Sequence, residues 1–119
     1  MGAITTFTEI IAWQKAHALV LEIYKITEEY PDNEKFGLVS QTRRCAVSVP
    51  SNIAEGFKRK SKNDSIHFYN IAEASLEELK YQTLLAHDLG YISKREYASL
   101  AQLLDETGKL IHGWSKIQR

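Results

Sequence analysis

The sequence has one cysteine, two prolines and no long run of apolar residues among its 119 positions. A single cysteine, Cys45, excludes an intramolecular disulfide and a zinc site built from several thiolates. No apolar run approaches the roughly 18 residues that a membrane span requires. No basic stretch precedes the first apolar residues, so the N-terminus lacks the pattern of a secretory signal. We therefore expect a cytoplasmic protein that has no disulfide and does not enter a membrane.

Recognisable catalytic and metal-binding motifs are also missing. The sequence has no HExxH motif, no pair of cysteines and no glycine-rich phosphate loop. None of its four histidines follows a glutamate by three positions, as the ExxH motif of metal sites in helical bundles requires. Arg43 and Arg44 precede Cys45 and would lower the pKa of its thiol, but no base is placed to activate it. We expect a protein that is not an enzyme and that holds no metal and no cofactor.

Apolar residues that alternate three and four positions apart are the main pattern that is present. In the first segment they are Ala12, Ala16, Leu19, Ile23, Ile26 and Tyr30. Pro31 should end this segment, and Gly90 should end a third segment that starts with capping residues at 61–64. Residues 93–96 form a capping box that opens a fourth segment. Because short links favour antiparallel neighbours, the sequence predicts an all-α fold, an antiparallel up-down-up-down four-helix bundle, as a single domain over residues 1–119.

The second helical segment, residues 36–57, contains a proline. Pro50 cannot donate a backbone hydrogen bond, and a proline inside a helix costs about 3 kcal/mol unless its surroundings compensate. Ser48 and Ser51 flank it with hydroxyls that can bond to or bend the local backbone. We expect the second helix to be kinked or broken near Pro50, and Gly56 to loosen the chain before the basic run that follows.

Equal numbers of acidic and basic residues hide an uneven distribution of charge. Residues 35–62 hold seven basic side chains and only Glu55 as an acid, so this stretch carries +6 and the rest of the chain −6. Clustered cations of this kind predict contact with the backbone of RNA or DNA. The candidates for this contact are Arg43, Arg44, Lys58, Arg59, Lys60 and Lys62. The alternative is that Glu73, Glu77 and Glu78 pair with the basic residues, within one chain or across subunits.

Polar residues in the second segment recur at helical spacing. Arg44, Ser48, Asn52 and Glu55 are four, four and three positions apart, which places them on one face of the helix. They would form either a hydrogen-bonded network that holds the helix around its proline or an exposed ligand site. The predicted structural motif comprises Arg44, Ser48, Pro50, Asn52, Glu55 and Gly56. Phe68 and Tyr69, which follow the basic run, would either stack on bases or pack between helices.

Residues 36–57 read FGLVSQTRRCAVSVPSNIAEGF. This stretch resembles the signature of the bacterial four-helix-bundle family named for ribosomal-RNA intervening-sequence proteins. That signature has an aromatic residue, Gly-Leu, a glutamine, Arg-Arg, and then Ser-Ile/Val-Pro-x-Asn-Ile-Ala-Glu-Gly. The resemblance extends to Trp13–Ala16, Tyr30–Pro31, Ile71–Leu79 and Leu89–Tyr91, and so covers nearly the whole chain.

The resemblance implies a partner and an assembly. Members of the family are often encoded within insertions in the large-subunit ribosomal RNA gene. The family is also similar to the accessory protein of diversity-generating retroelements, a pentameric barrel with a basic surface that works with a reverse transcriptase and nucleic acid. By this resemblance we expect a homo-oligomer, a pentamer, with RNA or DNA as a partner. A scaffold or protein-interaction module that binds no nucleic acid is the second hypothesis.

Overall fold

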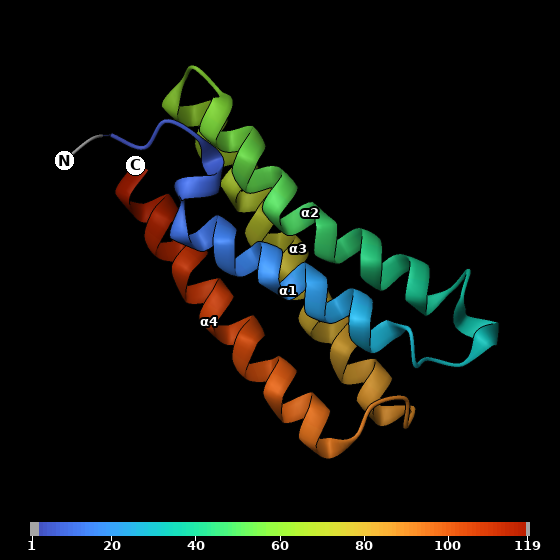
Figure 1. Ribbon diagram of the computed structural model, residues 1–119. Coiled ribbons are helices and arrows are strands. Elements are labelled where there is room, and N and C mark those ends of the chain that lie inside the picture. Colours follow the sequence, from blue (N-terminus) through green and yellow to red (C-terminus); the bar gives the residue numbers. More distant parts are fainter. Residues whose placement is uncertain (1–2, 119) are drawn as a thin grey trace.

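The computed structural model describes residues 3–118 and consists of helices connected by short loops (Figure 1). The four α-helices are α1 (Ile11–Thr27), α2 (Leu38–Lys58), α3 (Lys62–Asp88) and α4 (Lys94–Gln118). Two short 3-10 helices, η1 (Phe7–Glu9) and η2 (Asp32–Glu34), precede α1 and α2. No strand occurs within residues 3–118, so the prediction of an all-α fold is confirmed.

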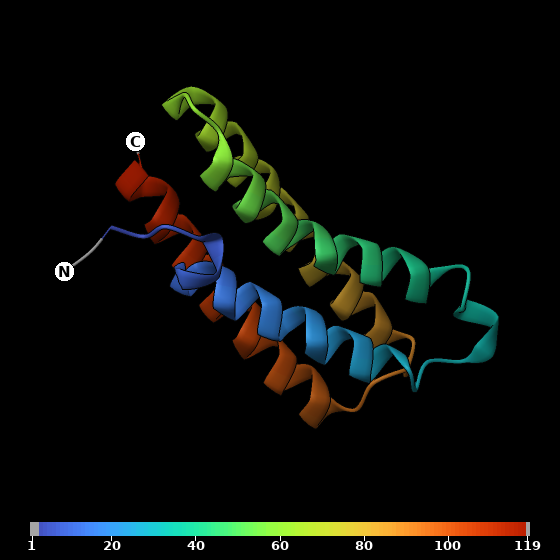
Figure 2. The same cartoon turned by 45° about the horizontal axis from the view of Figure 1, so that its top comes forward.

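The chain reverses direction at each connection, so the four helices run up, down, up and down (Figures 1 and 2). Each helix packs on two neighbours: α1 on α2 and α4, and α3 on α2 and α4. The bundle measures 45 × 25 × 19 Å, so the helices span its long dimension. The start of α1, the turn between α2 and α3 and the end of α4 therefore lie at one end, and the other two loops lie at the opposite end. No helix within residues 3–118 has the length and apolarity needed to cross a membrane.

The predicted capping signals start and stop the helices as expected. The Ser61 hydroxyl accepts a hydrogen bond from the Asp64 amide at 3.1 Å and caps α3. Ser93 and Glu96 exchange hydrogen bonds of 3.0 and 2.8 Å in a capping box before α4. Gly90 has φ +80°, the left-handed conformation that glycine adopts most readily after a helix. Local sequence therefore fixes both ends of the connection between α3 and α4.

The end of α1 differs from the expectation. The helix ends at Thr27, before Pro31 is reached, and the Tyr30 amide donates to the Thr27 carbonyl at 3.1 Å in a turn. The early end lets the buried Tyr30 ring pack beside Tyr91, with ring centroids 5.5 Å apart. Tertiary packing therefore ends this helix before proline does.

Pro50 lies inside an uninterrupted α2, so the expected break in this helix is wrong, and the kink stays a prediction. Hydrogen bonds on both sides of Pro50 hold the helix in place. The Asn52 side-chain amide donates to the carbonyl of Ser48 at 2.7 Å and to its hydroxyl at 3.0 Å. The Ser48 hydroxyl lies 2.8 Å from that of Ser75 on α3. These side-chain bonds and the burial of Pro50 compensate for the backbone bond that proline cannot make.

Glu34 joins the connection between α1 and α2 to two other parts of the chain. Its carboxylate accepts hydrogen bonds from the Tyr91 hydroxyl at 2.7 Å and from the Leu38 amide at 3.1 Å. Both bonds lower the pKa of Glu34 below its ordinary value of 4.5, and the bond from Tyr91 has the larger effect. Because the pKa is lower in the folded state, the carboxylate adds stability above pH 4.5, and this stability is lost as the pH falls through the folded-state pKa.

We expect Glu34→Gln to lose less stability than the wild type between about pH 5 and about pH 3, because the variant has no group that titrates there. Urea unfolding at both pH values measures the difference. Glu22→Gln is the control, because Glu22 is exposed and its side chain has no hydrogen bond within the described residues. An equal loss in Glu34→Gln and wild type would contradict the prediction.

Candidate nucleic-acid interface

Four of the predicted cations lie where the chain turns from α2 into α3. Lys58 is the last residue of α2, Arg59 caps its end in an extended conformation, and Lys62 is the first residue of α3. Lys58, Arg59, Lys60 and Lys62, here called the basic corner, are all exposed. Lys58 and Lys60 form no hydrogen bond or ion pair within residues 3–118. The basic corner therefore presents two cations, Lys58 and Lys60, that have no acidic partner within residues 3–118.

Arg59 is the most constrained side chain of the basic corner. Its guanidinium lies over the ring of Phe68, with Cζ 4.4 Å from the ring centroid. It also donates to Oε1 of Glu55 at 3.2 Å, one turn earlier. Both partners of this ion pair are about half exposed, so the pair adds little to stability. It holds the guanidinium at the surface, where a phosphate can still reach it.

Within residues 3–118, the three acids of α3 that could pair with the basic segment have other partners. Glu73 lies 3.6 Å from His112, Glu77 lies 3.7 Å from Lys80, and Glu78 accepts a hydrogen bond from Gln82 at 3.1 Å. The alternative is therefore wrong for pairing within one chain. Pairing between subunits stays a prediction.

Arg44 is exposed and has no partner within residues 3–118, but it lies apart from the basic corner. The helical rise places it about 21 Å from Lys58 along α2, and the helical twist places both on the same side within about 40°. The exposed residues between them are Val47, Ser51 and Glu55, so a single acid interrupts this surface. One strand of a duplex advances about 3.4 Å per phosphate, so the surface has the length of about six phosphates.

Arg43, the remaining candidate, turns away from this surface and toward α1. Its Nε donates to the Thr27 hydroxyl at 2.9 Å. Its Nη2 donates to the Tyr24 carbonyl at 3.1 Å and to the Glu28 carboxylate at 2.9 Å. The guanidinium also covers the ring of Tyr24, with Cζ 4.6 Å from the centroid. Arg43 therefore joins α2 to the last turns of α1.

Only part of the predicted polar network forms. Ser48 and Asn52 bond to each other and to Ser75, as described above, and hold α2 to α3. Arg44 and Glu55 are exposed and take no part in it, because Glu55 pairs with Arg59 instead. Of the two interpretations, a structural hydrogen-bonded network therefore describes only Ser48 and Asn52.

Gly56 has a packing role that its sequence context does not indicate. A Cβ atom at this position would lie 2.4 Å from Cε1 of Tyr69 and 3.0 Å from the Ser65 carbonyl oxygen. Tyr69 is 2% exposed, and its ring meets Trp114 edge-on with centroids 6.2 Å apart. Tyr69 is therefore a packing residue between helices, and its ring is not available to stack on bases.

Cys45 is not poised for nucleophilic chemistry. Its thiol donates to the Ser75 carbonyl at 3.0 Å, and burial raises its pKa to about 12, with the charge of Glu78 acting in the same direction. The expected lowering by Arg43 and Arg44 does not occur, because Arg43 points to α1 and burial dominates. Within residues 3–118, no group of three or more His, Cys, Asp or Glu side chains is arranged to hold a metal ion.

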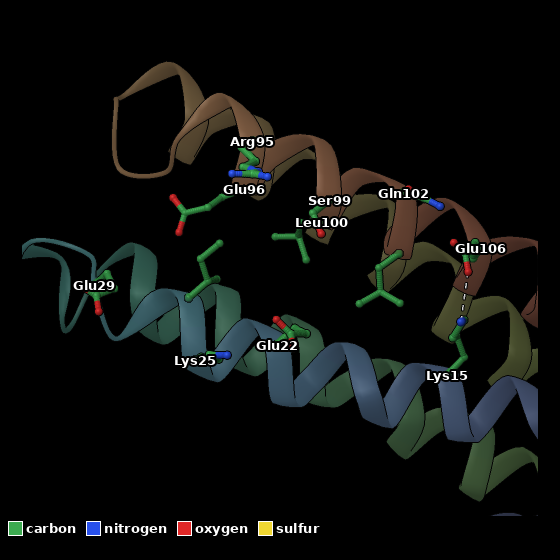
Figure 3. Close-up of a pocket in the computed structure, with 12 residues that line it drawn as sticks. Lys15, Glu22, Lys25, Glu29, Arg95, Glu96, Ser99, Leu100, Gln102 and Glu106 are labelled. Atoms are coloured by element: carbon green, nitrogen blue, oxygen red, sulfur yellow. Dashed lines mark ion pairs between the residues drawn. The ribbon is translucent and has the colours of Figure 1, made fainter.

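A groove of about 800 Å³ lies between α1 and α4 (Figure 3). Its charged lining residues are Lys15, Lys25 and Arg95, and Glu22, Glu29, Glu96 and Glu106. Lys15 lies 3.1 Å from Glu106, and its hydrogen bond and charge lower the pKa of that carboxyl. With four acids to three bases, this groove does not favour a polyanion, so the basic corner is the better candidate.

Comparison with known proteins identifies the family. The model of the 23S rRNA-intervening sequence protein family matches residues 8–113, which include α1, α2, α3 and most of α4. The chain belongs to this family. A crystal structure from the S23 ribosomal protein family of Bacteroides thetaiotaomicron, described as a protein with unknown function, has the same fold with a TM-score of 0.82. The two chains are 25% identical, and the match covers 89% of this chain and 96% of the other.

No curated protein matches the sequence. The resemblance to 23S rRNA-intervening sequence proteins, inferred from the signature at residues 36–57, is thus confirmed as membership of that family. Similarity to the retroelement accessory protein stays a prediction. Family membership alone does not define a biochemical role, and the basic corner is the feature that indicates one.

Proposed function

We propose that this 23S rRNA-intervening sequence protein is a non-enzymatic, oligomeric helical bundle that binds the backbone of RNA or DNA through its basic corner. One observation carries the proposal: four cations lie within five residues at an exposed turn, and neither Lys58 nor Lys60 has a partner within residues 3–118. Packing gives a turn little reason to hold so many like charges, which repel one another. Phosphates relieve this repulsion and release counterions when they bind.

The surface of α2 supports the same function. Arg44 continues the positive charge along the exposed side of the helix, and Arg59 is already held at the surface by Phe68 and Glu55. A strand that follows this side would meet the basic corner first and Arg44 about six phosphates later. Backbone binding of this kind depends on charge and reads no sequence by itself.

Apolar residues on the outside of the bundle support an oligomer. Tyr81 and Leu84, three positions apart on one side of α3, are 61% and 40% exposed. Large apolar side chains at the surface are typical of faces that another chain covers. We propose a homo-oligomer, with five subunits by resemblance, and its mass in solution tests the number.

The proposed function predicts binding that falls steeply with salt. We expect labelled single-stranded and duplex RNA and DNA to bind, with affinity falling roughly fifty-fold between about 50 and about 200 mM salt if three to four phosphates are contacted. Replacing Lys58, Arg59, Lys60 and Lys62 together by alanine should weaken binding at the lower salt by about tenfold or more. Fluorescence anisotropy measures both effects.

The matched control removes four other cations. Lys25, Lys94, Arg95 and Lys109 lie outside the basic corner, and their replacement by alanine changes the net charge by the same amount. This variant should bind as the wild type does, and both variants must keep the wild-type helicity and oligomeric mass. Equal losses in the two variants would indicate general charge attraction and contradict an interface at the basic corner. No binding by the wild type at the lower salt would favour the scaffold hypothesis.

A further inference from the structure

A second hollow lies directly beside the basic corner. It has a volume of about 570 Å³ and lies between the segment before α1 and the last turns of α2. Phe7 and Phe57 give it aromatic surface, Thr6 and Ser51 give it hydroxyl groups, and Glu55 and Lys58 give it charge. Ser51, Glu55 and Lys58 are four and three positions apart, so they share the face of α2 that also leads to Arg44.

The wall formed by the N-terminal segment is held by its own hydrogen bonds. The Glu9 carboxylate accepts bonds from the Thr5 and Thr6 amides at 3.0 and 3.1 Å. The Phe7 ring meets Trp13 edge-on, with centroids 5.0 Å apart, and Ile10 is buried in the core. The segment is thus fixed to α1, and the hollow is part of the folded bundle.

The chemistry of this hollow fits a nucleobase. A base has two apolar faces, which aromatic side chains contact favourably, and polar edges that need donors and acceptors. The Ser51 hydroxyl has no partner within residues 3–118, and Arg59 engages only Oε1 of Glu55, which leaves Oε2 to accept from a base amino group. Lys58 lines the hollow and also belongs to the basic corner, so a base in the hollow and its phosphate can be bound together.

We propose that this hollow binds the base of an unpaired nucleotide whose phosphate lies on Lys58 and Lys60. The inference rests on the proposed function and gives it a substrate class: a single strand, or a loop or end with unpaired bases. A base inside a duplex is stacked and paired, so it does not reach such a hollow without being extruded. The protein should therefore bind unpaired strands more tightly than duplexes. Phosphate contacts alone do not read the bases, so this preference would come from the hollow.

The test compares three probes with the same protein. They are a single-stranded RNA of eight nucleotides, an abasic strand with the same number of phosphates, and the duplex form of the RNA. The wild type should bind the natural strand about tenfold more tightly than the abasic strand, because one base stacked on aromatic side chains contributes an effect of this order. The duplex should lack this advantage.

A variant that fills the hollow without changing charge completes the test. Ser51→Leu combined with Ala54→Leu should bind natural and abasic strands equally, at the affinity of the wild type for the abasic strand. Ala98→Leu combined with Ser99→Leu makes the same two changes at exposed positions of α4, away from the hollow and from the basic corner, and should behave as the wild type does.

The outcomes separate the two proposals. Equal binding of natural and abasic strands by the wild type, with the salt dependence retained, would overturn the base-binding hollow and leave the phosphate interface intact. A filled variant that keeps the preference for natural strands would also overturn the hollow as the base-binding site. No binding of any probe at about 50 mM salt would remove the proposed function, and the inference with it.

Discussion

Gly56→Ala should lower the free energy of unfolding by about 2 kcal/mol, although alanine is the better helix former. The added Cβ would meet Cε1 of Tyr69 at 2.4 Å, and Tyr69, on α3, is buried where it meets α2 and Trp114 of α4. Overpacking at such a site costs about 3 kcal/mol, and replacing a helical glycine by alanine returns about 1 kcal/mol. Urea unfolding followed by circular dichroism measures the net loss.

Gly113→Ala is the matched control for Gly56→Ala. Gly113 lies inside α4, and a Cβ atom there would meet nothing within 4 Å. The same substitution should therefore stabilise the protein by up to about 1 kcal/mol. In a second control, Tyr69→Ala added to Gly56→Ala should cost less than the sum of the two single changes, because the clash is absent. A neutral or stabilising Gly56→Ala would show that the close contact of α2 with α3 does not require glycine.

Much of the fold follows from local sequence. The spacing of apolar residues predicts four helices, and the caps at Ser61, Gly90 and Ser93 place helix ends where the structure has them. These signals act between residues three or four positions apart, so they can be recognised in one sequence. Two features that local sequence does not indicate, the early end of α1 and the unbroken course of α2 at Pro50, have non-local causes. Tyr30 leaves α1 to pack beside Tyr91, and bonds that reach Ser75 on α3 support α2 around Pro50.

In the candidate interface, too, local sequence indicates the position of some residues and gives no indication of the contacts of others. The cations of the basic corner could be predicted because residues at a turn have few packing partners, so four positive charges there remain at the surface. For Arg43 the sequence indicates only a charge. Its partners Thr27 and Tyr24 lie 16 and 19 positions away, a distance at which sequence spacing gives no indication of contact.

The hollow beside the basic corner was missed for a related reason. Thr6 and Glu9 have the T-x-x-E spacing that often precedes a helix, and this local signal predicts the ordered turn before α1. Nothing in the sequence indicates that this turn packs against Ser51 and Lys58, which come more than forty positions later. A site formed between segments so far apart is found only once the helices are placed in space.

Arg43→Ala should lower the free energy of unfolding by about 2 kcal/mol and leave nucleic-acid binding unchanged. The substitution removes three hydrogen bonds, of which the bond to Thr27 is the best shielded from water: Thr27 is 2% exposed and the Arg43 side chain is 26% exposed. The bond to Glu28 contributes less, because that carboxylate is 77% exposed. Loss of the contact with the Tyr24 ring adds to the effect.

Comparison with Arg43→Lys and Arg44→Ala separates structure from binding at adjacent positions. Lysine keeps the charge but cannot replace the planar guanidinium that bonds to three groups at once, so Arg43→Lys should recover only a small part of the lost stability. Arg44→Ala should do the reverse. It should keep the free energy of unfolding of the wild type, because Arg44 is exposed and has no partner within residues 3–118. It should weaken binding to strands that are long enough to reach Arg44 from the basic corner. If Arg43→Ala bound RNA more weakly while remaining folded at the assay temperature, Arg43 would contact phosphate after all. Unchanged stability of Arg43→Ala would mean that its bonds to α1 do not hold α2 in place.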